Sequence, residues 1–544
     1  MGDPGGLEPH AVKPFAEIFL VVSMQFAGKV QADFVDVPGQ IAPAVHDLAW
    51  TARIDNLAHD RYIVKLINRV VKFEIASILS GMKSFDYEVA ILGGGSAGYA
   101  AARTAAGAGL KTAVIEGGAE VGGLCILRGC MPTKALLYAA EVMHLASHAQ
   151  PWGIRAGKVG FNLARVMARK DMLIDDFAGY RRKQLARGRF QFIRAQARFL
   201  DPHAVQMSNG KVLTAKSFII CTGSVVAPTP LPQLSAAGYL TSDEALRLKR
   251  LPKSLIVLGG GPIACEFAQF FARFGVKVTL IQRGEHLLRD FDADAAIELE
   301  RAFRREGIEL YTNTILTDAK RQGRRKTVLF QHGKKAVSVS AEEIFFALGR
   351  RPNISPLDLD RAGVAAGNGW IATNELLQTS APHIYAAGDC TGPHEIVHLA
   401  VQQGEIAAHN IARPKSPRRM DYRLFISIVF TEPQVALVGL TEKEARARGI
   451  PYQSASYPFN DHGKSLIMEA TDGFVKLLAD EKSGEILGGT CVGPAGGELI
   501  HEIVAAMAKR MSVRELAVMP HYHPTLAEIW TYPAEELAET ITAR

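Results

Sequence analysis

The feature that most constrains the fold is a strand–turn–helix–strand unit that the chain contains twice. The first copy spans residues 87–116 and has its glycine-rich turn at 93–98. The second copy spans residues 254–282 and has its turn at 259–264. In such a unit the helix N-terminus faces the turn, and its free N–H groups can bind a phosphate. Two copies in one chain predict an α/β protein with two dinucleotide-binding domains.

The first turn has three glycines at the spacing of a dinucleotide-binding fingerprint. Gly93 permits the tight bend, Gly95 lets the backbone approach a pyrophosphate, and Gly98 lets helix and strand pack closely. Glu116 follows Gly93 by 23 residues and ends the second strand, where an acid can bind ribose hydroxyls. Such turns also occur for packing alone, but the strands and helix around this one favour dinucleotide binding.

The second turn differs from the first at two positions. Gly259 and Gly261 keep the first two glycines, whereas Ala264 replaces the third. Gln282 lies 23 residues beyond Gly259, at the place that Glu116 holds in the first copy. A carboxylate at that place would repel a 2′-phosphate, and a glutamine does not.

Two arginines near Gln282 indicate NADPH rather than NADH. Arg283 is adjacent to Gln282, and Arg289 follows six residues later. Guanidinium groups bind phosphate through charge-assisted, often bidentate, hydrogen bonds. The alternative is that both arginines are solvated surface residues.

Composition and charge exclude several classes of protein. The 544 residues are 48% hydrophobic and 22% charged, which is ordinary for a globular protein of about three or four domains. The net charge is +7, and the basic residues are scattered along the chain, which favours anionic ligands over nucleic acid. No apolar run reaches the ~18 residues of a membrane span. We therefore expect a cytoplasmic protein with neither a membrane nor a nucleic-acid partner.

Two of the six cysteines, Cys125 and Cys130, are close enough in sequence to form a redox couple. Five residues of ideal helix rise about 7.5 Å, beyond the ~7 Å Cα limit for a disulfide, so a bond requires a distorted turn, which Gly129 makes easier. Pro132 suits the first turn of a following helix, whose positive end would favour the Cys130 thiolate. Two cysteines without further ligands make a poor zinc site, and two unrelated buried cysteines are the other alternative. The remaining four, expected to be small buried residues, are Cys221, Cys265, Cys390 and Cys491.

The segment 122–134 resembles the active-site motif of the flavin-dependent pyridine nucleotide–disulfide oxidoreductases. This family includes glutathione reductase, dihydrolipoamide dehydrogenase and mercuric reductase. The resemblance extends from about Phe85 to the C-terminus, and the other motifs follow in order. They are Cys221-Thr222-Gly223, with cysteine in place of the usual alanine, then 347–353 with Gly349 and Arg350, 384–389 ending in Gly388-Asp389, and 523–528 with His523 and Glu528.

The resemblance implies two Rossmann-like domains, for FAD and NADPH, and a C-terminal α+β dimerisation domain. Besides the two glycine turns, the implied cofactor-binding residues are Lys134, Thr222, Gly223, Gly349, Arg350, Gly388 and Asp389. The expected domains are an extension of unknown role at 1–84, the FAD domain at 85–224 and 353–423, the NAD(P)H domain at 225–352 and the dimerisation domain at 424–544.

The resemblance also implies a mechanism. NADPH reduces the flavin, which passes two electrons to a Cys125–Cys130 disulfide. Cys130, nearer the flavin, forms the charge-transfer thiolate, and Cys125 attacks the substrate disulfide. Lys134 lies near the flavin ring and pairs with Glu266.

In this family a histidine of the partner subunit completes the site. The matching residue is His523, which would act as acid–base for the thiols and would be oriented by Glu528. The active site would then be shared between the two subunits of a homodimer. His521 has no acid at the matching spacing and is expected at the surface or an interface.

The sequence leaves the substrate open. The NADPH-type residues favour reductases such as those for glutathione or mercuric ion, whereas the helix after the cysteine pair is lipoamide-dehydrogenase-like. Against a mercuric reductase, the tail at 539–544 lacks a terminal cysteine pair, and His523 stands where those enzymes tend to have tyrosine. Two other classes remain as alternatives: a flavin oxidase or diaphorase with structural cysteines, and a silent assembly subunit or basic nucleic-acid binder.

Residues 1–84 contain none of these motifs. A helical pattern at 60–80 is followed by Met82, which resembles a fresh start of a chain. The expectation is either a helical appendage or upstream sequence joined by a misplaced start.

Overall fold

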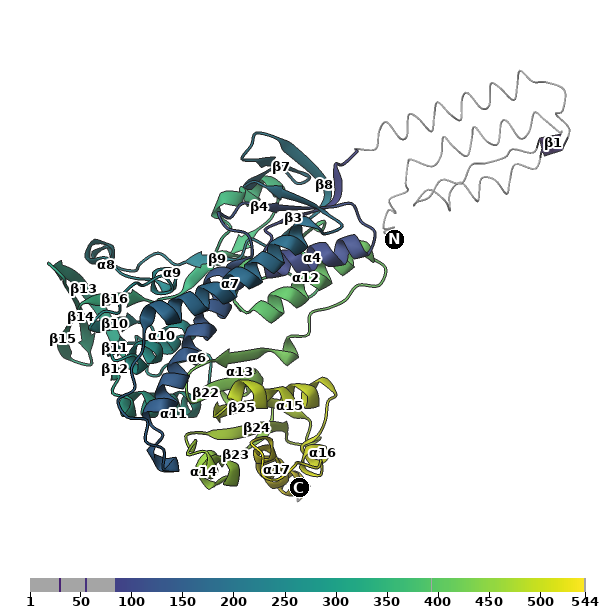
Figure 1. The fold of residues 1–544 in the computed structure, drawn as a ribbon. Coiled ribbons are helices and arrows are strands. Elements are labelled where there is room, and N and C mark those ends of the chain that lie inside the picture. Colours follow the sequence, from purple (N-terminus) through teal and green to yellow (C-terminus); the bar gives the residue numbers. More distant parts are fainter. Residues whose placement is uncertain (1–28, 31–53, 56–83, 393, 543–544) are drawn as a thin grey trace, which may run out of the picture. The chain divides into compact units, whose positions relative to one another are not determined.

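The computed structural model describes residues 29–30, 54–55, 84–392 and 394–542 (Figure 1). The chain divides into two compact units, Met1–Ser84 and Phe85–Arg544. In the first unit, β1 (Lys29–Val30) pairs antiparallel with β2 (Ile54–Asp55). The helix predicted at 60–80 and the start predicted at Met82 lie outside the described residues.

The first glycine turn belongs to a seven-stranded sheet of order β5-β4-β3-β8-β7-β6, in which β20 also pairs with β8. The strands next to β3 are parallel to it, and residues 89–92 at its centre are fully buried. Helices α4 and α12 pack against each other beside this sheet (Figure 1). The bounds are β3 (Tyr87–Leu92), α4 (Ser96–Gly107), β4 (Thr112–Glu116), β5 (Gln191–Arg194), β6 (Ala197–Asp201), β7 (Ala204–Met207), β8 (Val212–Ile220), β20 (Ile384–Ala386) and α12 (Val397–Ala412).

The second glycine turn belongs to a four-stranded parallel sheet of order β12-β11-β10-β16. Helix α10 follows the turn and buries Phe267, Phe270 and Phe271 against Phe345 and its neighbours. An antiparallel sheet of β13, β14 and β15 lies beside this unit. The bounds are β10 (Ser254–Leu258), α10 (Pro262–Arg273), β11 (Lys277–Ile281), α11 (Ala293–Arg305), β12 (Glu309–Tyr311), β13 (Thr314–Gln322), β14 (Arg325–His332), β15 (Lys335–Ala341) and β16 (Glu343–Phe346).

Short elements and two long helices connect these sheets. The two-stranded pair β9 and β17 joins the segments that follow the two dinucleotide units. Helices α6 and α7 pack against each other, and α6 also packs against α10. The bounds are α5 (Leu124–Arg128), α6 (Cys130–Ser147), α7 (Leu163–Ala186), β9 (Ser224–Val226), α8 (Pro232–Ala237), α9 (Ser242–Ala245), β17 (Arg350–Pro352), β18 (Ala366–Gly367) and β19 (Trp370–Ile371).

Both turns use glycine to bring a carbonyl oxygen close. A Cβ on Gly93 would lie 2.3 Å from the Cys221 oxygen, and one on Gly259 would lie 2.3 Å from the Ala347 oxygen. Gly98 is equally restricted, because its Cβ would lie 1.8 Å from the Gly93 oxygen. The second copy is more open at that third position, where Ala264 fits and is fully buried.

The C-terminal part is an antiparallel five-stranded sheet of order β21-β22-β25-β24-β23, which confirms the predicted α+β module. Helix α15 packs against β22 and β25, and α17 packs against β23. The sequence has a helical pattern at 526–539, and the structure there has a 3₁₀ turn at Ala527–Trp530 followed by α17. The bounds are β21 (Ile426–Val429), β22 (Gln434–Gly439), α13 (Glu442–Arg448), β23 (Tyr452–Pro458), α14 (Gly463–Ile467), β24 (Phe474–Asp480), β25 (Ile486–Gly493), α15 (Gly496–Ala508), α16 (Val513–Ala517) and α17 (Thr531–Thr542).

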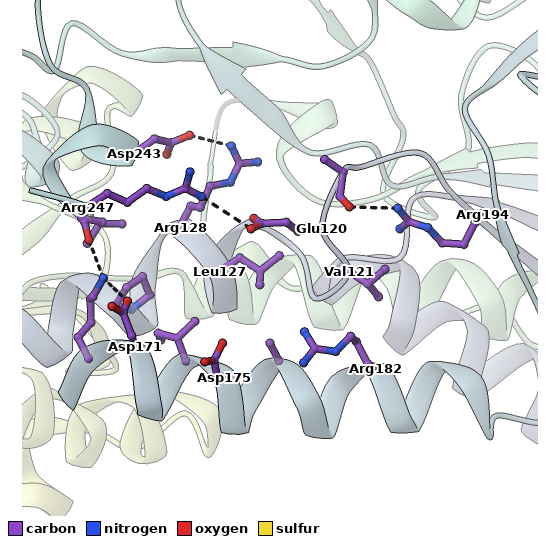
Figure 2. Close-up of a pocket in the computed structure, with 16 residues that line it drawn as sticks. Glu120, Val121, Leu127, Arg128, Asp171, Asp175, Arg182, Arg194, Asp243 and Arg247 are labelled. Atoms are coloured by element: carbon purple, nitrogen blue, oxygen red, sulfur yellow. Dashed lines mark hydrogen bonds and ion pairs between the residues drawn. The ribbon is translucent and has the colours of Figure 1, made fainter. Parts of the chain in front are cut away.

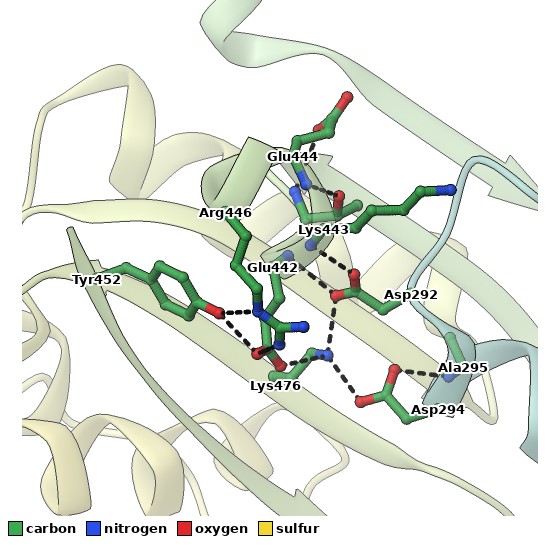
Figure 3. Close-up of polar contacts among 10 residues, drawn as sticks. Asp292, Asp294, Ala295, Glu442, Lys443, Glu444, Arg446, Tyr452 and Lys476 are labelled. Carbon is green, nitrogen blue, oxygen red and sulfur yellow. Dashed lines mark hydrogen bonds and ion pairs between the residues drawn. The ribbon is translucent and has the colours of Figure 1, made fainter. Parts of the chain in front are cut away.

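A buried ammonium group joins the second dinucleotide unit to the C-terminal sheet (Figure 3). Lys476 of β24 lies 2.9 Å from Asp292, 2.7 Å from Asp294 and 3.0 Å from Glu442. Asp292 also accepts the backbone N–H groups of Glu442 and Lys443 at the start of α13. Burial opposes ionisation of Asp292, but these donors and the ammonium outweigh it and lower its pKa. None of the helices in the described part of the chain is long and apolar enough to cross a membrane.

Replacing Lys476 by methionine is expected to destabilise the protein. Removing one partner of a buried ion pair costs about 3–5 kcal/mol, and the low end applies here because Asp294 is half exposed. Urea unfolding of the holoprotein measures the change. The difference from wild type should shrink as the pH falls below about 4, because the depressed carboxyl pKa values stabilise only the ionised folded state.

Lys443→Met is the matched control, since among the described residues its ammonium donates only to the exposed Arg289 carbonyl. It should change the unfolding midpoint little. Equal losses in the two variants would contradict the assigned role of Lys476.

Candidate active site

The cysteine pair lies on either side of a break between two helices. α5 ends at Arg128, α6 begins at Cys130, and Gly129 between them has φ −125° and ψ −114°. A Cβ on Gly129 would lie 3.1 Å from the Leu124 oxygen, so a side chain would crowd the break. Cys125 and Cys130 are free thiols, partly buried, and their side chains are hydrogen-bonded to each other. The break at Gly129 therefore provides the distorted turn that a bond between Cys125 and Cys130 requires.

The two thiols have opposite acidities. The hydrogen bond from Cys125 is the largest influence on Cys130, and together with the Lys134 charge it outweighs burial and lowers the pKa of Cys130 to about 7. The same hydrogen bond, burial and the neighbouring sulfur raise the pKa of Cys125 well above its usual range. Cys130 at the start of α6 is thus the thiolate, and Cys125 keeps its proton.

Lys134 and Glu266 form an ion pair between the two dinucleotide units. The Lys134 ammonium lies 2.8 Å from both oxygens of Glu266, whose side chain is only 3% exposed. The backbone N–H of Phe430 donates to the same carboxylate at 3.1 Å, and its ring lies 4.5 Å from the ammonium. No sequence motif pointed to Phe430, because it comes from the C-terminal part of the chain. This arrangement places a fixed positive charge beside Cys130.

The first glycine turn lies against the cysteine segment. A Cβ on Gly123 would lie 2.8 Å from the Gly95 Cα, so two glycines meet at this contact. Glu116 accepts the Gly94 N–H at 2.8 Å and the Gly118 N–H at 2.6 Å. Its carboxylate is therefore positioned at the turn, where the sequence predicts contact with ribose.

Three segments far apart in sequence meet beside this turn. Ser224 donates to Asp389 at 2.7 Å and accepts from Arg350 Nε at 2.8 Å. Gly388 donates to the Gln403 side chain at 2.7 Å. The Thr222 hydroxyl is buried and has no partner in the described residues. An unpaired hydroxyl beside an aspartate and an arginine fits a polar cofactor such as FAD. Gly223 and Gly349, at the same place, adopt the positive φ values that favour glycine.

Gln282 occupies the second turn as Glu116 occupies the first. A Cβ on Gly260 would lie 2.7 Å from the Gln282 amide carbon, which shows how closely this side chain lies on the turn. Arg283 is exposed beside it and has no ion pair within the described ranges. Arg289 is also exposed, but its guanidinium is 3.4 Å from Asp290. Of the two predicted arginines, Arg283 is therefore the freer to bind a phosphate.

His523 is fixed at one ring nitrogen and open at the other. Its Nδ1 lies 3.0 Å and 3.2 Å from the two Glu528 oxygens. The imidazole is 77% exposed, whereas the carboxylate is 10% exposed. His521 was expected at the surface or an interface, but its side chain is 7% exposed and lies 2.6 Å from Glu502. The spacing between His523 and Glu528 could not indicate this acid, because Glu502 precedes His521 and lies on helix α15.

A cavity of about 540 Å³ lies between the cysteine segment, α7 and α9 (Figure 2). Arg128 next to the redox pair reaches Asp243 at 2.7 Å, and Arg247 lies 3.7 Å from Glu120. These ion pairs connect the cysteine segment to the beginning of the second dinucleotide unit. Positive and negative side chains are mixed around the cavity, and its lining favours no single class of ligand.

Comparisons with known proteins agree with this geometry. A family model described as "Pyridine nucleotide-disulphide oxidoreductase" matches residues 87–404, and one described as its "dimerisation domain" matches residues 426–534. The chain is 36% identical over 459 residues to a dihydrolipoyl dehydrogenase of Bacillus subtilis, covering 81% of this chain and 96% of the relative. It is 33% identical over 445 residues to a mercuric reductase of Staphylococcus aureus, covering 81% of each. The solved flavoprotein disulfide reductase RclA of Escherichia coli superposes with a TM-score of 0.74 at 27% identity, covering 82% of this chain and 99% of RclA.

The Cys130 thiolate should titrate near pH 7 in the reduced protein. Replacing Cys125 by alanine removes the hydrogen bond that lowers this pKa most, so the titration should move to higher pH. The measurement is the pH dependence of Cys130 alkylation by iodoacetamide, determined by peptide mass spectrometry. Cys491→Ala, at a buried and distant cysteine, is the control and should leave the curve in place. An unchanged curve in Cys125→Ala would contradict the assigned asymmetry.

Proposed function

Because the chain belongs to the pyridine nucleotide-disulphide oxidoreductase family, we propose that it reduces a small disulfide by way of Cys125 and Cys130. Like its family, the chain is an FAD-dependent enzyme that uses NAD(P)H. Its substrate, its preference for NADPH and the roles of its residues belong to the proposal. The observation that carries the proposal is the lowered pKa of Cys130, which lies at the start of α6 and accepts a hydrogen bond from the Cys125 thiol.

The two cysteines divide the reaction between them. Bound FAD supplies the two-electron transfer that links NAD(P)H to the cysteine pair. In the reduced pair, the Cys125 sulfur gives up its proton and attacks one sulfur of the substrate disulfide, which releases the first product thiol. The Cys130 thiolate then attacks the Cys125 sulfur of the mixed disulfide, releases the second product thiol and forms the Cys125–Cys130 bond. Two electrons and the Cys125 proton have then passed to the substrate, and because Cys130 begins as a thiolate, the second product thiol takes its proton from solvent.

The raised pKa of Cys125 means that its attack requires a base. We assign this role to His523 of the partner subunit, whose Nδ1 is held by Glu528 and whose ring is exposed. The same imidazole then returns the proton to the departing product thiolate. The family dimerisation domain at residues 426–534 supports a homodimer, and His523 lies within it. A site shared between subunits is part of the proposal.

The cofactor assignments rest on the two turns and the segments beside them. For FAD we assign Lys134 and the residues around the first turn, and for NADPH the residues around the second. The FAD residues are Gly93, Gly95, Gly98, Glu116, Thr222, Gly223, Gly349, Arg350, Gly388 and Asp389. The NADPH residues are Gly259, Gly261, Ala264, Gln282, Arg283 and Arg289. We place the enzyme in the cytoplasm, where thiols are kept reduced.

Cys125→Ser should abolish disulfide turnover and leave reduction of the flavin by NADPH intact. Serine cannot form the mixed disulfide, whereas the turns that hold the cofactors are unchanged. Stopped-flow absorbance measures flavin reduction, and a panel of oxidised glutathione, lipoamide and mercuric ion measures turnover. Turnover retained at more than a few per cent would refute the role of Cys125. The wild-type panel identifies the substrate class.

Gln282→Glu should weaken NADPH relative to NADH, because a carboxylate repels the 2′-phosphate. We expect the ratio of kcat/KM for the two nucleotides to change by about 10-fold or more, with NADH affected least. Gln282→Met removes the amide without adding charge and is the control. An unchanged ratio in Gln282→Glu would remove the argument for NADPH.

A further inference from the structure

We propose that His462 is a positioning residue that orients Glu528, and through it the base His523. This inference deepens the proposed function and rests on the acid–base role given to His523 there. The carboxylate of Glu528 lies between two imidazoles. His523 Nδ1 is 3.0 Å from one oxygen, and His462 Nε2 is 3.4 Å from the other. The three side chains differ in exposure: His462 is 0% exposed, Glu528 10% and His523 77%.

The His462 ring is itself fixed on its far side. Its Nδ1 lies 2.8 Å from the Ser465 hydroxyl, and Ser465 is also fully buried. The rings of Phe459 and Tyr532 pack edge-on against it. Ser465 belongs to the short helix α14, and Glu528 to the 3₁₀ turn at Ala527–Trp530. The contact thus ties the loop before β24 to the segment that presents His523.

His462 is neutral at pH 7, because burial lowers its pKa despite the opposing charge of Glu528. The groups that face it are Glu528, the backbone carbonyl of Thr525, the hydroxyl of Ser465 and, beyond the carboxylate, His523. A neutral imidazole has one N–H. If the Ser465 hydroxyl donates to Nδ1, the N–H is at Nε2 and points to Glu528 and the Thr525 carbonyl.

This arrangement sets the tautomer of the base. His462 Nε2 faces Glu528 Oε1 at 3.4 Å, and His523 Nδ1 lies 3.2 Å from that oxygen and 3.0 Å from Oε2, so the charge of His462 Nε2–H acts on the carboxylate that holds His523. His523 then carries its proton on Nδ1 and has a lone pair on Nε2, as a base for a thiol requires. The N–H of His462 also shares the negative charge of Glu528. Without it, more of that charge acts on His523 and favours the protonated ring, which is not a base.

The sequence did not single out His462, because it stands 66 residues before Glu528. No motif spacing links the two residues, and only the fold brings them together. The buried position is also unusual for a histidine without a ligand, since its polar ring nitrogens must find partners there. The Ser465 hydroxyl is the partner of Nδ1, whereas Nε2 makes no hydrogen bond within the described residues and faces Glu528 at 3.4 Å.

The test uses the holoenzyme with His462→Leu and His462→Gln. Leucine removes the donor, so kcat with the accepted disulfide should fall about 10-fold with little change in KM, a part of the 10²–10⁴ that acid–base catalysis contributes. The acid limb of the kcat/KM profile should move to higher pH. Glutamine places an amide N–H near the position of Nε2 and should restore both. His332→Leu, at an exposed position of β14, is the control and should match wild type.

A second readout does not depend on turnover. Diethyl pyrocarbonate reacts with neutral imidazole, so the rate of His523 modification at a fixed pH, followed by peptide mass spectrometry, reports how much of the ring is available as a base. We expect this rate to fall in His462→Leu and to return in His462→Gln. A lower melting temperature with an unchanged rate of His523 modification in both variants would overturn the inference and leave His462 as a packing residue.

The two proposals fail in different ways. If His523→Gln retains wild-type disulfide turnover, the acid–base role in the proposed function is wrong, whatever the modification of His523 shows. If His523→Gln is inactive and the modification of His523 by diethyl pyrocarbonate does not respond to His462→Leu, the proposed function stands and the positioning role is wrong.

Discussion

The structure depends on one interruption of the backbone, the break at Gly129. A continuous helix would separate the Cα atoms of the two cysteines by more than a disulfide can span. The break ends α5, starts a new helix at Cys130 and lets the two thiols share a hydrogen bond. From that contact follows the difference in acidity between Cys130 and Cys125. Two thiols of equal pKa would not distinguish the sulfur that we propose to receive electrons from the sulfur that we propose to attack the substrate.

The turns and the cysteine segment could be predicted because their causes are local. Gly93 is required by a clash with a carbonyl oxygen that recurs at Gly259 in the second unit, and Gly98 is required by the Gly93 oxygen in the first unit. The contact of Lys134 with Glu266 came only from the family resemblance, since 132 residues separate the two. Phe430 and His462 had no signal at all, because each acts through a partner that only the tertiary fold brings near. The helical pattern at 526–539 did not predict the 3₁₀ turn for a similar reason: the segment bends so that Glu528 and Trp530 are buried.

Two ammonium groups hold the second dinucleotide unit in place from different sides. Lys134 reaches it from α6 through Glu266, and Lys476 reaches it from β24 through Asp292 and Asp294. Each is a buried or half-buried charge whose partners lie on another part of the chain. Such pairs contribute little net stability when geometry is poor, but they are costly to break, so they fix one relative arrangement. The Lys134 charge also lowers the pKa of Cys130, so the position of this unit affects the acidity of the thiol.

The comparison of the two glycine units suggests how one fold serves two nucleotides. Both units place a side chain from the end of the second strand directly on the turn, Glu116 in one and Gln282 in the other. The two turns share the close approach of a carbonyl oxygen at Gly93 and Gly259, but they differ at the third glycine, which Ala264 replaces, and in the charge of the side chain on the turn. The Glu116 carboxylate accepts two backbone N–H groups and presents a negative charge. The Gln282 amide is neutral, and the adjacent Arg283 is exposed. Because a 2′-phosphate differs from a hydroxyl chiefly in charge, this exchange supports the proposal that the second unit binds NADPH.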